Sequence, residues 1–267
     1  MDPSPSLLKT FESLLARRKS SSALRRLTIA PLNSVDFSSN DFLSLSTFPP
    51  LRSQYEEHLL THRFLPLGSG GSRLLDGNSA YVEDLEKDIA AFHGAEAGLL
   101  FNSGFDANSG LFSCVPQPGD IILYDQFIHA SVHEGMRLSR AKHCIAFKHN
   151  CVEDFERILR KNIQEDKEIQ SGTRNVFVAL ESVYSMDGDL APIQQFVERT
   201  ETLLPKGNGH IIVDEAHSTG IYGPKGAGVV CALGLENRIL ARLHTFGKAL
   251  SSGGGTFARH ALTSATG

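Results

Sequence analysis

Apolar side chains recur at helical spacing in two parts of this chain. Residues 81–93 carry them at every third or fourth position, which is typical of one face of a helix, and Gly94 follows as the expected C-cap. A similar spacing of leucine and phenylalanine over residues 7–15 predicts a short amphipathic helix near the N-terminus.

Short apolar runs between polar and amphipathic stretches predict buried β-strands. The runs lie at residues 97–101, 121–124, 175–180, 210–213 and 239–243. Continuous apolar runs between helices are typical of a mainly parallel sheet that is covered on both faces. The sequence therefore predicts an α/β fold with three layers, α/β/α.

Polar residues follow each of these runs. They are residues 102–105, 125–129, 181–185, 214–217 and 245–248. Ligands of such sheets bind in the crevice beyond the carboxyl ends of the strands. We therefore expect these five segments to build one site.

Lys248 and Asp214 carry the most specific chemistry among these segments. An enzyme that uses pyridoxal phosphate needs a lysine to hold it as a Schiff base, and a carboxylate to keep its pyridine nitrogen protonated. Each residue alone has an ordinary explanation, because a lysine after glycine is usually a solvated turn residue and an Asp at a strand end is often a helix cap. The pairing at two strand ends favours pyridoxal phosphate.

Two nucleotide-binding interpretations fail on spacing. The letters DEAH at 214–217 also occur in helicases, but these need a phosphate loop G-x-x-x-x-G-K-[ST]. Here Arg242 stands at the first glycine of that loop and Ala249 follows Lys248. The segment GSGGSR at 68–73 lacks the third glycine of the dinucleotide fingerprint, since Arg73 occupies that place.

The phosphate and the ring of the cofactor have further candidate partners. Ser103, Gly104 and Phe105, at a predicted strand-to-helix junction, would offer main-chain N–H groups to a phosphate, although a tight turn explains them equally well. Thr245 would add a hydroxyl.

Three side chains at strand ends are candidates for the cofactor ring. His129 would stack on it, and His217 and Ser185 would hydrogen-bond its hydroxyl group. A lone histidine is more often structural, so these assignments depend on the shared strand-end position.

Composition narrows the class of protein. The 267 residues are 41% hydrophobic with a net charge of -4, which indicates a globular protein and neither a nucleic-acid nor a membrane partner. The four cysteines form no C-x-x-C pair and stand mostly among apolar neighbours, so we expect buried reduced thiols and no metal site. The N-terminus lacks a secretory signal, so the expected location is intracellular, cytoplasmic by default, with a peroxisome or mitochondrion left open.

Several motifs, in order, resemble those of the α-oxoamine synthases, which are fold-type I pyridoxal phosphate enzymes. The motifs are FSSNDFL at 37–43, GSGGSR at 68–73, FNSGFDAN at 101–108, HAS at 129–131, ESVYSMDGD at 181–189, DEAH at 214–217 and TFGK at 245–248. The resemblance covers residues 14–254. It implies that Lys248 holds the cofactor, that Asp214 pairs with the ring nitrogen and that His129 stacks on the ring.

The same resemblance implies roles for the other candidates. It places Ser185 and His217 near the ring hydroxyl, and Gly104, Phe105 and Thr245 at the phosphate. It also implies substrate contacts: Asn40 near the amino-acid carboxylate, and Arg25 in an arm that meets the acyl substrate.

The implied activity is the condensation of an amino acid with an acyl thioester, with loss of CO₂. The sequence is most similar to the branch that joins alanine to pimeloyl-CoA in biotin synthesis. Two alternatives stay open: another activity of the family, of the 5-aminolevulinate synthase, serine palmitoyltransferase or glycine C-acetyltransferase type, or a non-catalytic subunit or fragment that keeps the fold.

The resemblance also predicts the domain organisation. Residues 1–45 would form an N-terminal helical arm, 46–254 an incomplete cofactor-binding large domain and 255–267 a divergent tail, with the family's C-terminal domain absent. A homodimer is expected, in which residues 68–73 are offered to the neighbouring subunit's site.

Overall fold

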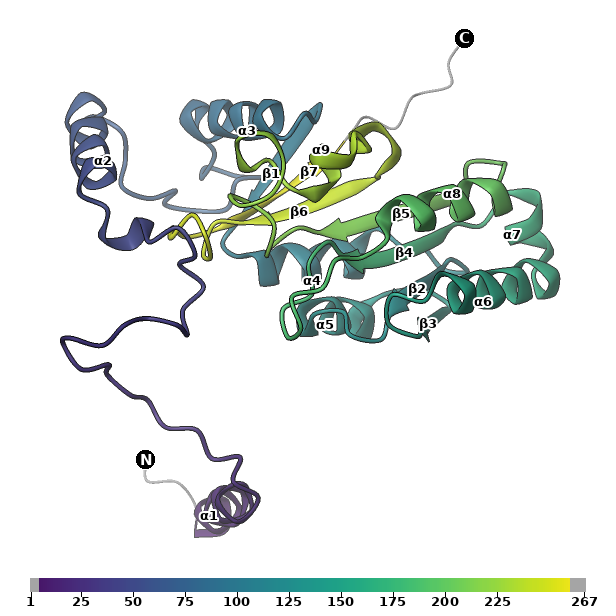
Figure 1. Ribbon diagram of the computed structural model, residues 1–267, viewed down its shortest axis with the longest axis horizontal. Coiled ribbons are helices and arrows are strands. Elements are labelled where there is room, and N and C mark those ends of the chain that lie inside the picture. Colours follow the sequence, from purple (N-terminus) through teal and green to yellow (C-terminus); the bar gives the residue numbers. More distant parts are fainter. Residues whose placement is uncertain (1–4, 260–267) are drawn as a thin grey trace. The chain divides into compact units, whose positions relative to one another are not determined.

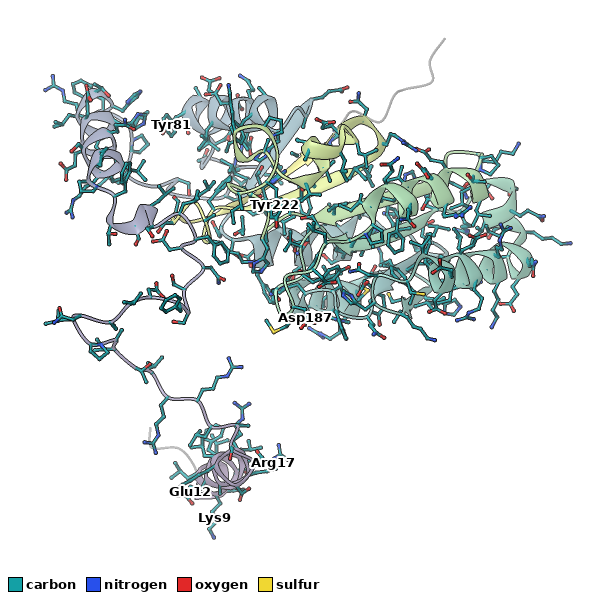
Figure 2. All side chains as sticks on the ribbon, viewed as in Figure 1. Lys9, Glu12, Arg17, Tyr81, Asp187 and Tyr222 are labelled. Atoms are coloured by element: carbon teal, nitrogen blue, oxygen red, sulfur yellow. The ribbon has the colours of Figure 1, made fainter. Side chains whose placement is uncertain are left out.

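The computed structural model describes residues 5–259 in two compact units, Met1–Ser38 and Ser39–Gly267. The first unit contains helix α1, Pro5–Ser20, which confirms the helix predicted near the N-terminus. Its leucine and phenylalanine side chains are exposed, and Lys9, Glu12 and Arg17 project from the same helix (Figure 2). After α1 the described chain of this unit forms turns but no further helix or strand.

A seven-stranded sheet in the second unit follows the order β1-β7-β6-β5-β4-β2-β3 (Figure 1). The strands are β1 Ala97–Phe101, β2 Ile121–Asp125, β3 His143–Phe147, β4 Val176–Glu181, β5 Gly209–Asp214, β6 Ala241–Thr245 and β7 Gly255–Arg259. All pairings are parallel except those of β7, which runs antiparallel to both β1 and β6. The carboxyl ends of the other strands therefore meet at one edge.

Helices connect the strands and cover the sheet. They are α2 Pro49–Thr61, α3 Ala80–Phe92, α4 Gly104–Cys114, α5 Ala130–Leu138, α6 Val152–Glu165, α7 Lys167–Ser171, α8 Ile193–Leu203 and α9 Val229–Leu233, with 3₁₀ turns at Leu45–Thr47, Pro224–Gly226 and Glu236–Arg238. Helix α3 is the one predicted at 81–93, and Gly94 beyond it has φ +60° as expected of a C-cap glycine. No helix within residues 5–259 is long and apolar enough to cross a membrane.

Alternate residues of the central strands face two different helical layers. In β4, Val176, Val178 and Leu180 pack in one core with side chains of α6 and α8. Phe177 and Ala179 pack in a second core with side chains of α4 and α5. Because both faces are buried, the strand reads as a continuous apolar run rather than an alternating one. The predicted three-layer α/β/α fold is confirmed.

The sheet contains two strands that the apolar runs did not predict. β3 lies at the edge, where three of its five residues are exposed. β7 places residues 255–259 inside the sheet, where the sequence had assigned them to a tail beyond the large domain, and residues 260–267 lie outside the described part. β6 spans Ala241–Thr245, whereas the predicted run was 239–243. Both ends are thus shifted by two residues, and Thr245 is the last residue of the strand.

The prediction of buried cysteines is wrong for two of them. Cys114 and Cys144 are exposed, because they lie at the end of α4 and on the edge strand β3. Cys151 and Cys231 are half-buried, and all four thiols are free.

Candidate active site

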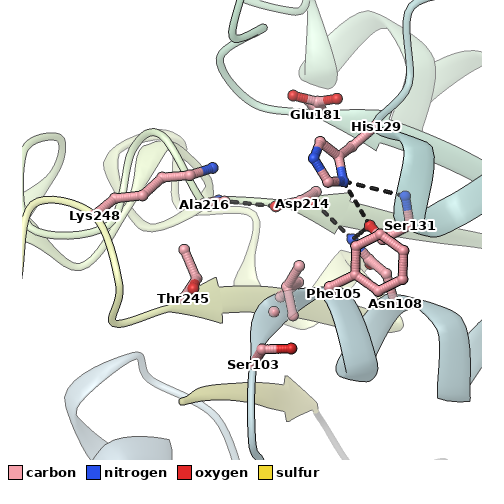
Figure 3. A pocket seen from close by; sticks show the side chains of 12 residues that line it. Ser103, Phe105, Asn108, His129, Ser131, Glu181, Asp214, Ala216, Thr245 and Lys248 are labelled. Atoms are coloured by element: carbon pink, nitrogen blue, oxygen red, sulfur yellow. Dashed lines mark hydrogen bonds between the residues drawn. The ribbon is translucent and has the colours of Figure 1, made fainter. Parts of the chain in front are cut away.

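The carboxyl ends of five strands surround one cavity of about 180 Å³ (Figure 3). Seven of the predicted residues line it: Ser103, Gly104, Phe105, His129, Asp214, Thr245 and Lys248. Asn108, Ser131 and Glu181 line it too, although the sequence had given them no role of their own. The strand-end argument therefore located the cavity but not all of its polar groups.

Lys248 lies in the loop after β6 and is half-buried. This loop is closed by hydrogen bonds from Ser251 N to Lys248 O, 2.8 Å, and from Phe246 N to Gly254 O, 3.0 Å. Burial lowers the pKa of the Lys248 ammonium, and the nearby acidic side chains, Asp214 foremost and then Glu181, oppose this shift. A lysine with a lowered pKa is closer to the free amine that reacts with carbonyl groups.

His217 contacts the reactive end of Lys248. Its Nε2 lies 2.8 Å from Lys248 Nζ. An ammonium group can only donate, so Nε2 accepts this hydrogen bond and the ring proton resides on Nδ1. Burial, with help from the Lys248 charge, lowers the pKa of His217 to about 4, so the ring is neutral at neutral pH.

Asp214 ends β5 and is 6% exposed. Its Oδ1 accepts a hydrogen bond from the Ala216 N–H at 2.9 Å, and its Oδ2 accepts one from Asn108 Nδ2 at 2.7 Å. Two N–H donors stabilise the carboxylate form and fix its plane. The group is thus a rigid acceptor at the wall of the cavity.

The N-terminus of α4 forms another wall. Ser103 is its N-cap: the hydroxyl accepts a hydrogen bond from Asp106 N at 3.0 Å. A Cβ at Gly104 would lie 3.0 Å from the Cβ of Thr245, so glycine allows helix and strand to meet here. The first N–H groups of an α-helix have no carbonyl partner within the helix, and they favour an anion.

His129 is the N-cap of α5 and is held by the next turn of the helix. Its Nδ1 accepts from the Ser131 N–H at 3.2 Å and lies 2.7 Å from Ser131 Oγ. Ser131 Oγ in turn is 3.0 Å from Asn108 Nδ2, the group that also donates to Asp214. Asn108 and Ser131 are 1% and 0% exposed. Hydrogen bonds through the buried side chains of Asn108 and Ser131 therefore join Asp214 to His129, which is exposed at the cavity.

Glu181, at the end of β4, adds a second carboxyl group to the cavity. It is 4% exposed, and burial raises its pKa to about 8, with the Asp214 charge acting in the same direction. Glu181 is therefore largely protonated at neutral pH. Its place at a strand end was visible in the sequence, but its burial was not.

Ser185 does not reach the cavity wall, in contrast to the expected contact with a ring hydroxyl. The chain turns after β4, where Tyr184 N donates to Asp189 O at 3.0 Å and Gly188 N donates to Tyr184 O at 2.9 Å. Ser185 lies in this turn with its side chain exposed.

The two predicted substrate contacts, Asn40 and Arg25, belong to different units of the structure. Asn40 is exposed and does not line the cavity. Its segment approaches the site through Phe42, whose ring centroid is 6.3 Å from that of His217. Arg25 belongs to the unit Met1–Ser38, and it is exposed there.

Known proteins resemble this chain over most of its length. A family model described as aminotransferase class I and II matches residues 33–264. An 8-amino-7-oxononanoate synthase of Emericella nidulans is 58% identical over 256 residues, which cover 95% of this chain and 62% of that protein. An aminoacyl transferase sphA of Aspergillus fumigatus is 41% identical over 257 residues, or 95% of this chain and 55% of that protein.

A solved structure supports the same grouping. A serine palmitoyltransferase variant from S. paucimobilis, with PLP and myriocin bound, has a TM-score of 0.79 and 28% identity and covers 96% of this chain and 64% of its own. The chain thus spans less than two thirds of the length of these relatives. By its family match, the chain belongs to the aminotransferase class I and II family.

Proposed function

We propose that this protein is a pyridoxal phosphate-dependent C-acyltransferase that joins an amino acid to an acyl thioester. One observation carries the proposal: the Lys248 amine, the Asp214 carboxylate and the N-terminus of α4 line a single cavity. These are the groups that the aldehyde, the ring nitrogen and the phosphate of the cofactor require. The solved relative binds PLP, which supports the same cofactor here.

The residues present fit each part of this cofactor. Lys248 would attach it covalently through Nζ, and Asp214 would accept the hydrogen bond of the protonated ring nitrogen. Ser103, Gly104 and Thr245 would surround the phosphate, since the packing of Gly104 against Thr245 keeps side chains out of that space. His129 would cover one face of the ring.

The bound cofactor would supply an electron sink for the electron pair left on the amino acid's Cα when a bond to it breaks. Lys248 is placed to take the α-proton and to return it, since burial lowers the pKa of its ammonium group. His217 holds the Lys248 nitrogen from one side, at 2.8 Å, and thereby limits its directions of approach. Asp214 keeps a negative charge beside the ring.

The parent reaction balances as follows. The amino acid Cα gives up its proton and bonds to the acyl carbon, and the thioester C–S bond breaks so that the sulfur leaves and takes up a proton as a thiol. The amino-acid carboxylate then leaves as CO₂, and Cα takes a proton in its place. Alanine and pimeloyl-CoA are the proposed substrates, which the identity of 58% to an 8-amino-7-oxononanoate synthase supports.

A second candidate is the same reaction with other substrates. The aminoacyl transferase sphA at 41% identity and the serine palmitoyltransferase with a TM-score of 0.79 favour it. Both candidates use the same cavity residues, so the difference lies in the acyl chain and the amino acid.

A homodimer is proposed for the full-length protein. Large apolar side chains flank the loop at residues 68–73, and Leu67, Leu74 and Leu75 are 102%, 95% and 80% exposed. Such exposed apolar surface is typical of an interface. Light scattering should give twice the mass of the full-length chain, and a monomer with normal activity would contradict the proposal.

Covalent attachment tests the cofactor assignment. The chain is incubated with pyridoxal phosphate, reduced with borohydride and digested for peptide mapping. We expect label on Lys248; label on Lys225 with Lys248 unmodified would overturn the assignment. Thiol release from pimeloyl-CoA with alanine, set beside palmitoyl-CoA with serine, then separates the two substrate candidates. Covalent attachment without turnover of any pair by the full-length protein would indicate a non-catalytic subunit.

A further inference from the structure

The hydrogen-bonded chain from Asp214 through the buried side chains of Asn108 and Ser131 to His129 determines where hydrogen atoms lie at the cavity. Asn108 Nδ2 carries two protons, and two acceptors are within reach: Asp214 Oδ2 at 2.7 Å and Ser131 Oγ at 3.0 Å. The opposite orientation of the amide would put its oxygen against the Asp214 carboxylate, acceptor against acceptor. Asn108 therefore donates in both directions.

The next link follows from the first. Ser131 Oγ accepts from Asn108, so its single proton is free to point to His129 Nδ1, which is 2.7 Å away. The Ser131 N–H points to the same Nδ1 at 3.2 Å. A nitrogen that receives two donors carries no proton of its own. The ring proton of neutral His129 must then lie on Nε2.

The orientation of the ring gives this proton a direction. Nδ1 faces Ser131, and Figure 3 shows the other ring nitrogen on the side of His129 that faces Lys248. Burial lowers the pKa of His129, so the neutral form prevails at neutral pH. Nε2–H is thus a donor aimed into the cavity, and it does not rotate freely because Nδ1 is held by two bonds.

We propose that Asn108 and Ser131 are positioning residues that connect the Asp214 carboxylate to His129 by a relay of hydrogen bonds. This relay fixes the tautomer of the His129 ring and directs its Nε2–H into the cavity. The role that this gives His129 in the reaction rests on the proposed function. The tautomer itself does not, because it follows from contacts among residues of this chain alone.

Nuclear magnetic resonance of the histidine rings tests the tautomer directly. Two-bond ¹H–¹⁵N correlation of the chain labelled at histidine nitrogens, without any ligand, reports which nitrogen carries the proton. The His129 signals are assigned from their loss in His129→Gln. We expect a protonated Nε2 and a hydrogen-bonded, unprotonated Nδ1. A proton on Nδ1 in the wild-type chain would overturn the proposal.

Ser131→Ala tests the relay, and Ser109→Ala is its matched control. Both hydroxyls lie between α4 and α5, but that of Ser109 donates to the Ser131 carbonyl at 3.2 Å and does not contact the ring. Ser131→Ala should shift the His129 Nδ1 resonance toward that of an unbonded nitrogen, with some Nδ1–H form. Ser109→Ala should leave it unchanged. Equal spectra for Ser131→Ala and the wild type would contradict the proposed hydrogen bond from Ser131 to His129. Equal shifts in Ser131→Ala and Ser109→Ala would contradict it too.

The possible outcomes distinguish a variant that does not fold from a failure of the proposed function and from a failure of the hydrogen-bond relay. If Ser131→Ala does not fold, the wild-type spectrum still decides the tautomer, and Ser131→Cys retains a weaker donor that should restore part of the shift. If the chain fails to attach pyridoxal phosphate, the proposed function fails while the tautomer assignment stands. If Lys248 takes the label but the His129 Nδ1 resonance is the same in Ser131→Ala as in the wild type, the hydrogen-bond relay alone is wrong.

Discussion

Two polar clusters begin at consecutive residues of the DEAH motif, and they differ in what their side chains face. The cavity cluster consists of Asp214, Asn108, Ser131 and His129, and every member lines the cavity. The core cluster consists of Glu215, His244, Arg242 and His93, and none of them does. Glu215 and His244 are 0% exposed and Arg242 is 1% exposed.

The core cluster has the contacts of a structural element. The rings of His93 and His244 stack with centroids 3.5 Å apart, and Arg242 Nη1 donates to the His93 carbonyl at 2.6 Å. Glu215 Oε1 accepts from Val230 N at 2.9 Å. These bonds join β5 and β6 to α3 and α9. Burial of an ionisable side chain therefore does not by itself mark a functional group in this fold, and the opening toward a cavity is the distinguishing feature.

The largest effect is expected from Lys248→Ala, which removes the reactive group of the cavity. Covalent attachment of the cofactor should be lost, and full-length activity should fall at least about 10²–10⁴-fold from the proton-transfer role alone. Thermal melting should change little because Lys248 makes no contact with the core cluster. Lys161→Ala, on the exposed face of α6, is the control. Retained labelling in Lys248→Ala would identify another lysine.

Asp214→Asn and Glu215→Gln form a pair that compares the two clusters at adjacent positions. In Asp214→Asn, an amide donor would face Asn108 Nδ2, so Asn108 should turn over and draw the Ser131 proton away from His129. We expect full-length kcat to fall by about 10²–10³-fold, with a much smaller change in cofactor affinity because the phosphate contacts remain. Glu215→Gln should alter melting and leave cofactor affinity unchanged. Near-normal turnover in Asp214→Asn would contradict its role.

The raised pKa of Glu215 should be visible in the pH dependence of stability. Burial raises its pKa from 4.5 to about 7, so between these values the folded chain binds more protons than the unfolded chain. The free energy of unfolding due to this group therefore falls as the pH rises through that window. Glu215→Gln removes the effect, so its melting temperature relative to the wild type should increase from pH 4.5 to pH 7. A constant difference would show that Glu215 titrates normally.

The corresponding substitution in the cavity should act over a higher pH range. Burial raises the pKa of Glu181 to about 8, so the relative stability of Glu181→Gln should continue to increase up to that pH. Because Glu181 lines the cavity, saturating cofactor should change this profile, whereas that of Glu215→Gln should stay as it is.

The smallest effect is expected from Ser103→Ala, the N-cap of α4. Loss of the cap should cost about 1 kcal/mol, or roughly 2–4 °C in melting temperature. Ser79→Ala is the matched control, because the Ser79 hydroxyl caps α3 by accepting from Val82 N at 3.3 Å. Both variants should melt earlier, but only Ser103→Ala should weaken binding of the cofactor. Equal affinities would remove Ser103 from the phosphate site.

The sequence predicted the cavity because its walls follow local rules. Buried strands appear as apolar runs, and the polar residues after them, such as Lys248 and Asp214, must meet at one edge of a parallel sheet. Ser185 also follows a strand, but the turn after β4 carries it away from the cavity. Strand-end position is thus a strong guide only where the next residues do not reverse the chain.

The rest of the site depends on contacts between distant segments. Asn108 and Ser131 are polar residues inside helices, and nothing local indicates that they are 3.0 Å apart. β7 was missed for a similar reason: its residues follow a glycine-rich loop, and they pair with a strand far away in the sequence. The motif resemblance included Asn108 and Ser131, yet it gave them no role, which only the fold supplies.

The position of β7 has a consequence for how the protein is made. Among the strands that the structure describes, β1, which precedes α4 and the proposed phosphate site, pairs with β7 alone. The hydroxyl of Thr256 in β7 reaches the Leu99 carbonyl in β1, across 157 residues. At a synthesis rate of about 5–20 residues per second, β7 is made on the order of ten seconds after β1. This early strand has an unpaired edge during that interval, so we expect chaperone dependence or aggregation to begin there.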